Sequence, residues 1–320
     1  MAFYDIFNGD ADGICALHQL RLAQPRDAQL VTGVKRDIQL LARVDAGAGD
    51  VLTVLDVSLH ENRADLDRLL ERGARCVYFD HHYAGELPRH AGFEAHIDTA
   101  PDVCTSLLVD RHLGGAHRAW AVVAAFGDNL FEAAKRAAAP LALPDAQLRE
   151  LRELGECINY NAYGESPEDL HFHPADLYRR LGPYRDPLAF MREDPAFITL
   201  REGYAADVAR AQRIAPLEAS AEGAVFVLPD AAWSRRVSGV FGNLLARGHP
   251  ERAHAVLVPK SGGAFTVSVR APRANPVGAD ELCRQFPTGG GRKAAGGINH
   301  LPADQMEAFT RAFARAFARA

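Results

Sequence analysis

The sequence has 320 residues, few cysteines and no long apolar run, and these absences exclude several classes of protein. Its five cysteines are scattered and include no Cys-x-x-Cys pair, which argues against a disulfide framework or a cysteine zinc site. No apolar stretch is long enough to span a bilayer, and no basic-then-apolar leader precedes the first apolar run. We therefore expect a cytoplasmic protein with small buried cysteines and no membrane partner.

A strong charge of either sign is also missing. The formal net charge is −5, with 48% hydrophobic and 24% charged residues, which is ordinary for a globular protein. This charge argues against broad binding of long nucleic acids, although a local basic patch stays open. The length is sufficient for two domains, each with its own core.

Apolar runs and amphipathic segments alternate in the first 140 residues. Amphipathic helices are expected to follow several of the apolar runs. This alternation predicts an α/β fold with a parallel sheet. The expected strands span residues 3–7, 29–32, 51–55, 74–79 and 93–97.

Acidic residues and histidines directly follow three of these strands. They are Asp10, Asp12, Asp56, Asp80, His81 and His82. Parallel strands end at one edge of the sheet, where ligands bind, so these side chains should gather there. Gathered carboxylates raise one another's pKa unless a cation balances them. Carboxylates with imidazoles favour Mn²⁺, with Mg²⁺ as the alternative, over zinc. The competing interpretation is a set of helix N-caps and solvated turns.

The rest of the chain is expected to form a helical connector and a smaller α/β C-terminal domain. The expected parts are residues 1–140, 141–216 and 217–320. The connector contains His171 and His173, a pair able to bind metal but more typical of a surface loop. Phe309, Phe313 and Phe317 have the four-residue spacing of a core-facing helix stripe.

The order of the motifs resembles the DHH phosphoesterase superfamily. Asp-Ala-Asp-Gly at 10–13 is followed by an apolar run ending in Asp56, by Asp80-His81-His82, and by Gly-Asp at 127–128. The segment 289–297, GGGRKAAGG, is similar to the GGGH-x-x-A-A-G motif of the DHH-associated C-terminal domain. The superfamily includes RecJ-type exonucleases, oligoribonucleases that dephosphorylate pAp, and cyclic-dinucleotide phosphodiesterases.

The resemblance implies a parallel-sheet DHH domain with a dinuclear metal site, most simply two Mn²⁺ ions. Asp10 would hold one ion and Asp12 the other, with Asp56 bridging them. His81 and Asp128 would complete the second ion's sphere. Behind these ligands, Asp80 would orient a histidine while His82 faces the substrate phosphate, and these two residues form the catalytic pair.

Two positions depart from the family pattern. Many relatives have histidine or aspartate where this chain has Asn8, whose amide would be a weaker metal ligand. Arg292 replaces the histidine of the glycine-rich motif, and an arginine can grip a phosphate but cannot donate a proton near neutral pH. The expected substrate-binding residues are Arg270, Gly289, Gly290, Gly291, Arg292 and Lys293.

These features predict a metal-dependent phosphoesterase, exonuclease-like, that acts on a short single-stranded oligonucleotide or a nucleotide. A homodimer is compatible with the sequence. The alternatives are a pyrophosphatase of the same superfamily, a phosphatase of small metabolites, and a nucleotide-binding protein that has lost catalysis.

Overall fold

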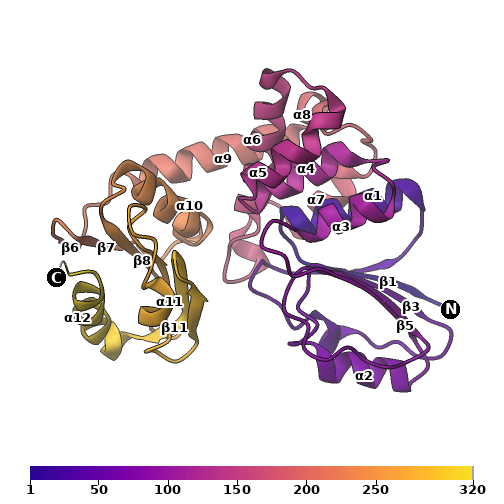
Figure 1. Cartoon of the computed structure of the whole chain (residues 1–320), viewed down its shortest axis with the longest axis horizontal. Helices are drawn as coiled ribbons and strands as arrows, with labels where there is room; N and C mark the ends of the chain where they lie inside the picture. The colour runs from indigo at the N-terminus through magenta and orange to yellow at the C-terminus, as the bar shows by residue number, and fades with distance from the viewer. Residues whose placement is uncertain (319–320) are drawn as a thin grey trace. The chain divides into compact units, whose positions relative to one another are not determined.

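A computed structural model describes residues 1–318 of the chain. Contacts divide the chain into two compact units, Met1–Glu202 and Gly203–Ala320, and helix α9 (Pro195–Ala211) contains the division (Figure 1). Among the described residues, no helix is both long and apolar enough to cross a membrane. All five cysteines are buried and free, as predicted.

The first unit is built on a five-stranded parallel sheet. Its strands have the order β2-β1-β3-β4-β5, and every neighbouring pair runs parallel. The parallel sheet confirms the predicted fold class. The strands are β1 (Phe3–Phe7), β2 (Gln29–Val31), β3 (Val51–Leu55), β4 (Arg75–Asp80) and β5 (Phe93–Ile97).

Helices cover both faces of this sheet (Figure 1). Helices α1 (Ala11–Ala23), α3 (Thr105–His112) and α4 (Arg118–Gly127) lie on one face, and α2 (Arg63–Glu71) lies on the other, near the short η1 (Leu40–Arg43). Alternate strand residues enter two separate cores, Phe7 and Phe79 toward α1 and α4, Ile6 and Tyr78 toward α2. Burial on both faces explains why these strands are continuous apolar runs.

The helical segment after α4 packs into the core of the first unit. Leu151, Leu154 and Ile158 of α6 share one buried cluster with Trp120 of α4. The predicted domain limits at 140 and 216 stay a prediction. The remaining elements of the segment are α5 (Phe131–Ala138), η2 (Ala139–Leu141), α6 (Asp145–Asn161), η3 (Pro167–Asp169), α7 (Pro174–Leu181) and α8 (Pro187–Glu193).

The second unit is built on a six-stranded mixed sheet. Its order is β10-β11-β9-β8-β7-β6, in which β7 and β8 run parallel and the other pairs antiparallel. The strands are β6 (Glu218–Ala219), β7 (Gly223–Val227), β8 (Ala253–Pro259), β9 (Ala264–Arg270), β10 (Gly289–Arg292) and β11 (Ala295–Pro302).

Helices pack on both faces of the second sheet as well. The buried side chains of α10 (Ala232–Gly248) form one core, and those of α11 (Ala279–Cys283) and α12 (Met306–Phe317) form another, while the short η4 (Ala303–Gln305) precedes α12. Phe309 and Phe313 are buried, and Phe317 packs against the same cluster. The aromatic stripe of the last helix therefore belongs to the core, as predicted.

Candidate metal centre

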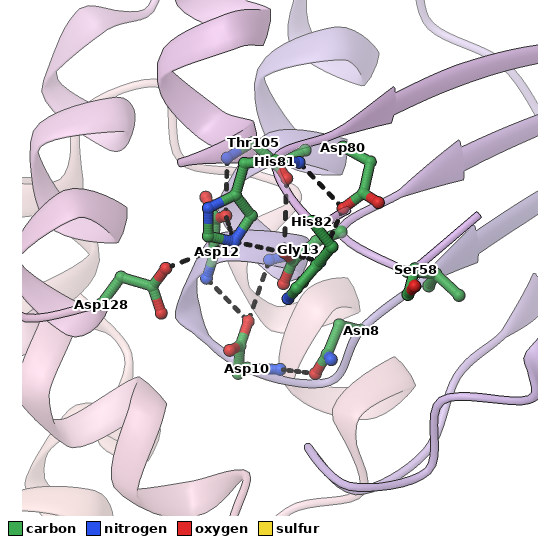
Figure 2. Close-up of polar contacts among 12 residues, drawn as sticks. Asn8, Asp10, Asp12, Gly13, Ser58, Asp80, His81, His82, Thr105 and Asp128 are labelled. Carbon is green, nitrogen blue, oxygen red and sulfur yellow. Dashed lines mark hydrogen bonds and ion pairs between the residues drawn. The ribbon is translucent and has the colours of Figure 1, made fainter. Parts of the chain in front are cut away.

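Three neighbouring strands bring acidic side chains to one edge of the first sheet (Figure 2). Strands β1, β3 and β4 run parallel, so their carboxyl ends lie at the same edge. Asp10, Asp56 and Asp80 lie at or shortly after these ends, and all three are almost fully buried. Asp128, at the C-cap of α4, faces the same group.

The turn between β1 and α1 is organised by the Asp10 carboxylate. Asp10 is the N-cap of α1, and its Oδ1 accepts hydrogen bonds from the backbone N–H groups of Asp12 (2.9 Å) and Gly13 (3.1 Å). Position 13 has no room for a side chain, because a Cβ there would lie 2.2 Å from the Asn8 carbonyl oxygen. Capping occupies one carboxylate oxygen of Asp10 and leaves Oδ2 for a charged partner.

The first turn of α3 holds Asp12. The backbone N–H of Thr105 donates to Oδ2 and that of Ser106 to Oδ1, each at 2.7 Å. Both N–H groups lie in the first turn of the helix, where they have no partner within the helix and where a negative charge is favoured. Burial and the charge of Asp128 nevertheless raise the pKa of Asp12 above its ordinary value. The Asp12 carboxylate is therefore fixed in orientation, and a nearby cation would stabilise its charged form.

His81 points one ring nitrogen at three carboxylates. Its Nδ1 lies 2.9 Å from the Val103 carbonyl oxygen, which can only accept, so Nδ1 donates. Its Nε2 lies 3.4 Å from Asp56 Oδ1, 3.7 Å from Asp128 Oδ2 and 3.9 Å from Asp12 Oδ2. Ligand atoms that each lie about 2.1 Å from one ion are about 3–3.5 Å apart. Asp12, His81 and Asp128 form one group whose atoms could hold a divalent cation, and Asp56 forms a second such group with His81 and His82.

Asp56 is buried in an unusual backbone conformation. Its φ of 59° lies in the left-handed region, which is costly for residues other than glycine and is concentrated at functional sites. The Thr105 hydroxyl donates to Oδ1 at 3.3 Å. Burial, followed by the charges of Asp10 and Asp12, raises the pKa of Asp56 well above its ordinary range. The donor set, carboxylates with one imidazole, fits a hard or borderline divalent cation such as Mn²⁺.

Asp80 holds the two histidines that follow it. Its Oδ1 accepts from the His81 backbone N–H at 2.9 Å and from His82 Nδ1 at 2.7 Å. Burial alone would lower the pKa of His82, but the hydrogen bond and charge of Asp80 outweigh it, so the pKa of His82 lies above its ordinary value. The His82 side chain is 44% exposed. The His82 ring is thus oriented by Asp80 on its buried side and is open to solvent on its other side.

Sequence reasoning missed Lys35, which lies in the loop after β2 and reaches into the carboxylate cluster. Its Nζ pairs with Asp10 Oδ2 and lies 3.4 Å from Asp128 Oδ1 and 3.2 Å from Asn159 Oδ1. Burial alone would lower the pKa of Lys35, but the nearby carboxylates, first of all Asp10, raise it well above its ordinary value. Burial alone would raise the pKa of Asp10, yet the Lys35 ammonium helps to hold it below its ordinary value.

One compositional signal could have drawn attention to Lys35. The chain contains 36 lysines and arginines, of which only four are lysine, at positions 35, 135, 260 and 293. Of these four, Lys35 alone reaches into the carboxylate cluster, where an ammonium is a compact point charge and a guanidinium would be broad and planar.

The Asn8 side chain joins the β1–α1 turn to the loop that carries Lys35. Its Oδ1 accepts from the Asp10 backbone N–H at 3.2 Å, and its Nδ2 donates to the Lys35 carbonyl oxygen at 3.2 Å. Asn8 is buried. Both ends of its amide are therefore used in holding loops together, and its role as a metal ligand stays a prediction.

The histidine pair of the connector takes part in local structure. His171 Nε2 lies 2.9 Å from the Tyr160 hydroxyl, and His173 Nδ1 accepts from the Ala175 backbone N–H at the start of α7. Neither residue belongs to the groups among residues 1–318 that could hold a metal ion, which are Asp56 with His81 and His82, and Asp12 with His81 and Asp128.

In the second unit the glycine-rich segment forms a hairpin of β10 and β11. Its register places Arg292 opposite Ala295, and Ala295 opposite Arg270 of β9, so the two arginine positions lie in one row across three strands. Arg292 and Lys293 are exposed, whereas Arg270 Nε donates to Asn243 Oδ1 at 2.7 Å. The predicted phosphate-binding residues thus lie near one end of this sheet.

The glycines of this hairpin meet close backbone contacts. At Gly291 the φ is 138°, and a Cβ would lie 2.5 Å from the Gly296 Cα. At Gly289 a Cβ would lie 1.8 Å from the Cys283 carbonyl oxygen, whereas Gly290 has open space beside it. Two of the three glycines are therefore required by packing alone.

No protein-family model matches the sequence, and no curated protein matches it. Solved structures match over almost the whole chain. The exonuclease RecJ bound to manganese has a TM-score of 0.66 at 17% identity, covering 100% of this chain and 91% of its own. The pGpG-specific phosphodiesterase PggH from Vibrio cholerae has a TM-score of 0.57 at 14% identity, covering 99% of each chain.

A second RecJ, from Thermus thermophilus in complex with Mn²⁺, has a TM-score of 0.63 at 19% identity. The match covers 98% of this chain and 52% of that one, so this chain spans about half the length of that RecJ. Likeness at these identities establishes the fold. The chain therefore has the fold of the RecJ structures.

Proposed function

We propose that this chain is a divalent-metal-dependent phosphoesterase that hydrolyses short oligonucleotides or nucleotides, with Mn²⁺ as the first candidate ion. The observation that carries the proposal is His81, whose Nε2 faces three carboxylates at 3.4–3.9 Å while its other nitrogen is fixed by a backbone carbonyl. The names of neighbours with the same fold, an exonuclease bound to manganese and a pGpG-specific phosphodiesterase, support a phosphate-ester substrate.

The proposed ligands of the ion are Asp12, Asp56, His81 and Asp128. A cation bound by them would act as a Lewis acid that lowers the pKa of a water and offsets charge on a phosphoryl group. The N–H groups of α3 and the Val103 carbonyl keep two of these ligands in place. Such supporting contacts commonly change metal affinity by about 10–100-fold when removed.

His82 is the proposed residue that touches substrate. Its Nδ1 is bound to Asp80, so Nε2 is the atom left for a phosphoryl or leaving-group oxygen. From this position it can hold the phosphoryl group or donate a proton to the leaving oxygen. Asp80 is a positioning residue, because it fixes the ring and its tautomer from the buried side.

The second unit is proposed to bind further phosphates of the substrate. Arg270 and Arg292 lie in one row of the sheet, and Lys293 follows in the hairpin turn. Arginine grips phosphate bidentately. We expect Arg292→Ala to raise KM several-fold with little change in kcat, whereas an equal loss of kcat would mean that Arg292 acts in the chemical step.

The deciding assay offers the Mn²⁺-loaded protein linear dinucleotides, pAp, cyclic dinucleotides and pyrophosphate, with the products separated by chromatography. Asp56→Asn should lower the rate at least about a hundredfold, because it removes a charged ligand. Asp67→Asn, on the exposed side of α2, makes the same chemical change away from the site and should leave the rate unchanged. No hydrolysis of any substrate would refute the proposal, and tight nucleotide binding without turnover would make the chain a binding protein.

A further inference from the structure

We propose that the Lys35 ammonium replaces one of the two ions that the family resemblance implies, so that the site holds one divalent cation beside a fixed lysine charge. The inference rests on the metal site of the proposed function. It differs from the resemblance in the number of ions and in giving Asp10 a protein cation as its partner.

Both carboxylate oxygens of Asp10 already have protein partners. Its Oδ1 caps α1 through two backbone N–H groups, and its Oδ2 pairs with Lys35 Nζ. A divalent cation on Oδ2 would share that oxygen with the ammonium, and the two positive charges would repel each other at close range. Consistent with this, Asp10 belongs to neither group of side chains among residues 1–318 that could hold an ion, which are Asp12 with His81 and Asp128, and Asp56 with His81 and His82.

The ammonium is surrounded by as many oxygen atoms as it has N–H donors. A lysine has three donors, and Lys35 Nζ has three oxygen neighbours, on Asp10, Asp128 and Asn159. Two of these are carboxylates and one is a neutral amide, which is the type of donor set that a hard cation would use. Because all three N–H donors have protein partners, the Lys35 ammonium serves as a fixed positive charge inside the site and not as a group that binds substrate.

The loop that carries Lys35 is fixed on both sides. The Lys35 N–H donates to the Ala162 carbonyl oxygen at 2.9 Å, and the Lys35 carbonyl accepts from Asn8 Nδ2 at 3.2 Å. The turn at Gly9 lies directly against the same loop, since a Cβ on Gly9 would be 2.0 Å from the Gly33 carbonyl oxygen. With its backbone held in this way and its side chain only 26% exposed, the lysine reaches the carboxylates from a defined position.

The charge of the cluster is compatible with one ion. Asp10, Asp12, Asp56 and Asp128 together carry four negative charges. One divalent cation and the ammonium leave a net charge of −1, and two cations and the ammonium would leave +1, so the charges admit one ion without deciding the number. In this arrangement Asp10 pairs with the Lys35 ammonium, and Asp12 and Asp56 face the ion at His81. Asp128 contributes one oxygen to each of the two positive groups.

The test counts metal ions in the full chain. Wild type, Lys35→Met and Lys35→Ala would be equilibrated with excess Mn²⁺, freed of unbound metal, and analysed by elemental analysis and by Mn²⁺ EPR. We expect one Mn²⁺ per wild-type chain with the spectrum of an isolated ion, and a second, exchange-coupled Mn²⁺ in the Lys35 variants. Lys135→Ala removes the same charge from an exposed position on α5 and should keep one ion.

Two coupled ions in the wild-type protein would overturn this inference and leave the proposed function intact. No bound ion in the wild type would overturn both. A Lys35→Met chain that folds, as judged by thermal melting, and still binds a single ion would also contradict the replacement. The wild-type count tests the proposal even if neither Lys35 variant folds.

Discussion

Helices α4 and α6 approach each other through glycines, and the substitution Gly155→Ala tests that contact. Gly155 lies in the middle of α6, and a Cβ there would be 2.1 Å from the Val123 carbonyl oxygen and 2.9 Å from the Gly127 nitrogen, both on α4. On α4, a Cβ at Gly127 would be 2.9 Å from the Gly155 carbonyl oxygen. The added methyl group would therefore meet backbone atoms, which cannot turn aside as a side chain can.

Two opposing terms set the expected magnitude. In an exposed helix, replacing glycine by alanine stabilises by about 0.5–1 kcal/mol. At Gly155 the methyl group overfills a tight backbone contact, and overpacking costs about 1–3 kcal/mol. A backbone oxygen at 2.1 Å places this site at the upper end of that range, so we expect a net loss of about 2 kcal/mol in the free energy of unfolding.

The assay is urea unfolding followed by tryptophan fluorescence. The chain has two tryptophans, and Trp120 of α4 is fully buried in the first unit. A Trp233→Phe background therefore reports on the first unit alone. Gly47→Ala is the matched control, because its Cβ would make only an ordinary 3.7 Å contact with the Arg72 carbonyl oxygen, and it should change stability by less than about 1 kcal/mol.

Gly155→Ala should also weaken the metal site. Asn159 lies one turn further along α6, and Asp128 caps α4, so both oxygens around Lys35 Nζ depend on the distance between these helices. We expect weaker Mn²⁺ binding together with the lost stability. A variant as stable as wild type, with unchanged Mn²⁺ affinity, would refute the contact and the positioning argument together.

Three other substitutions test the interiors of the two units. Burial lowers the pKa of His18 to about 4, so the unfolded chain binds the proton more tightly and stability falls as the pH drops from 6.5 towards 4. His18→Gln, whose amide can still donate to the Tyr184 carbonyl oxygen, should remove about 2 kcal/mol of the stability loss between pH 7.5 and pH 5. Equal pH dependence of stability in the variant and the wild type would contradict this. Asp5→Asn breaks a buried bidentate pair with Arg21 and should cost about 3–5 kcal/mol in urea unfolding, whereas a loss below about 1 kcal/mol would show that the pair is solvated. Phe309→Ala empties a fully buried site in the second unit and should cost about 3–5 kcal/mol there; a loss confined to the first unit would be inconsistent with that core.

The strands and their acidic ends could be predicted because both depend on neighbours in sequence. Apolar runs such as Val51–Leu55 become strands wherever helices cover both faces, and the structure has that strand at the predicted bounds. Asp56 directly follows β3 and Asp80 is the last residue of β4, so a parallel sheet brings them to one edge whatever the helices do. The gathering of the acids is a consequence of topology, which the alternation of strands and helices predicts.

The groups that support these acids could not be predicted in the same way. The N–H groups of Thr105 and Ser106 that hold Asp12 are backbone atoms more than ninety residues away, and any residue types could supply them. The hairpin of the glycine-rich segment is set by its pairing with β9, another contact distant in sequence. A sequence pattern reports side-chain type and spacing, so it does not predict partners that are backbone groups distant in sequence.

Asn8 and Lys35 show how a departure from a family pattern can be explained only together with a distant residue. Taken alone, an amide where relatives have histidine or aspartate suggests a weakened first metal ion. In the structure the same amide donates to the Lys35 carbonyl oxygen and accepts from the Asp10 N–H, while Lys35 Nζ pairs with the Asp10 carboxylate. An aspartate at position 8 would lose the N–H donor and place a negative charge against a carbonyl oxygen, so the loop carrying Lys35 would be held less firmly. Asparagine at this position is therefore suited to a site in which a lysine, and not a metal ion, is the partner of Asp10.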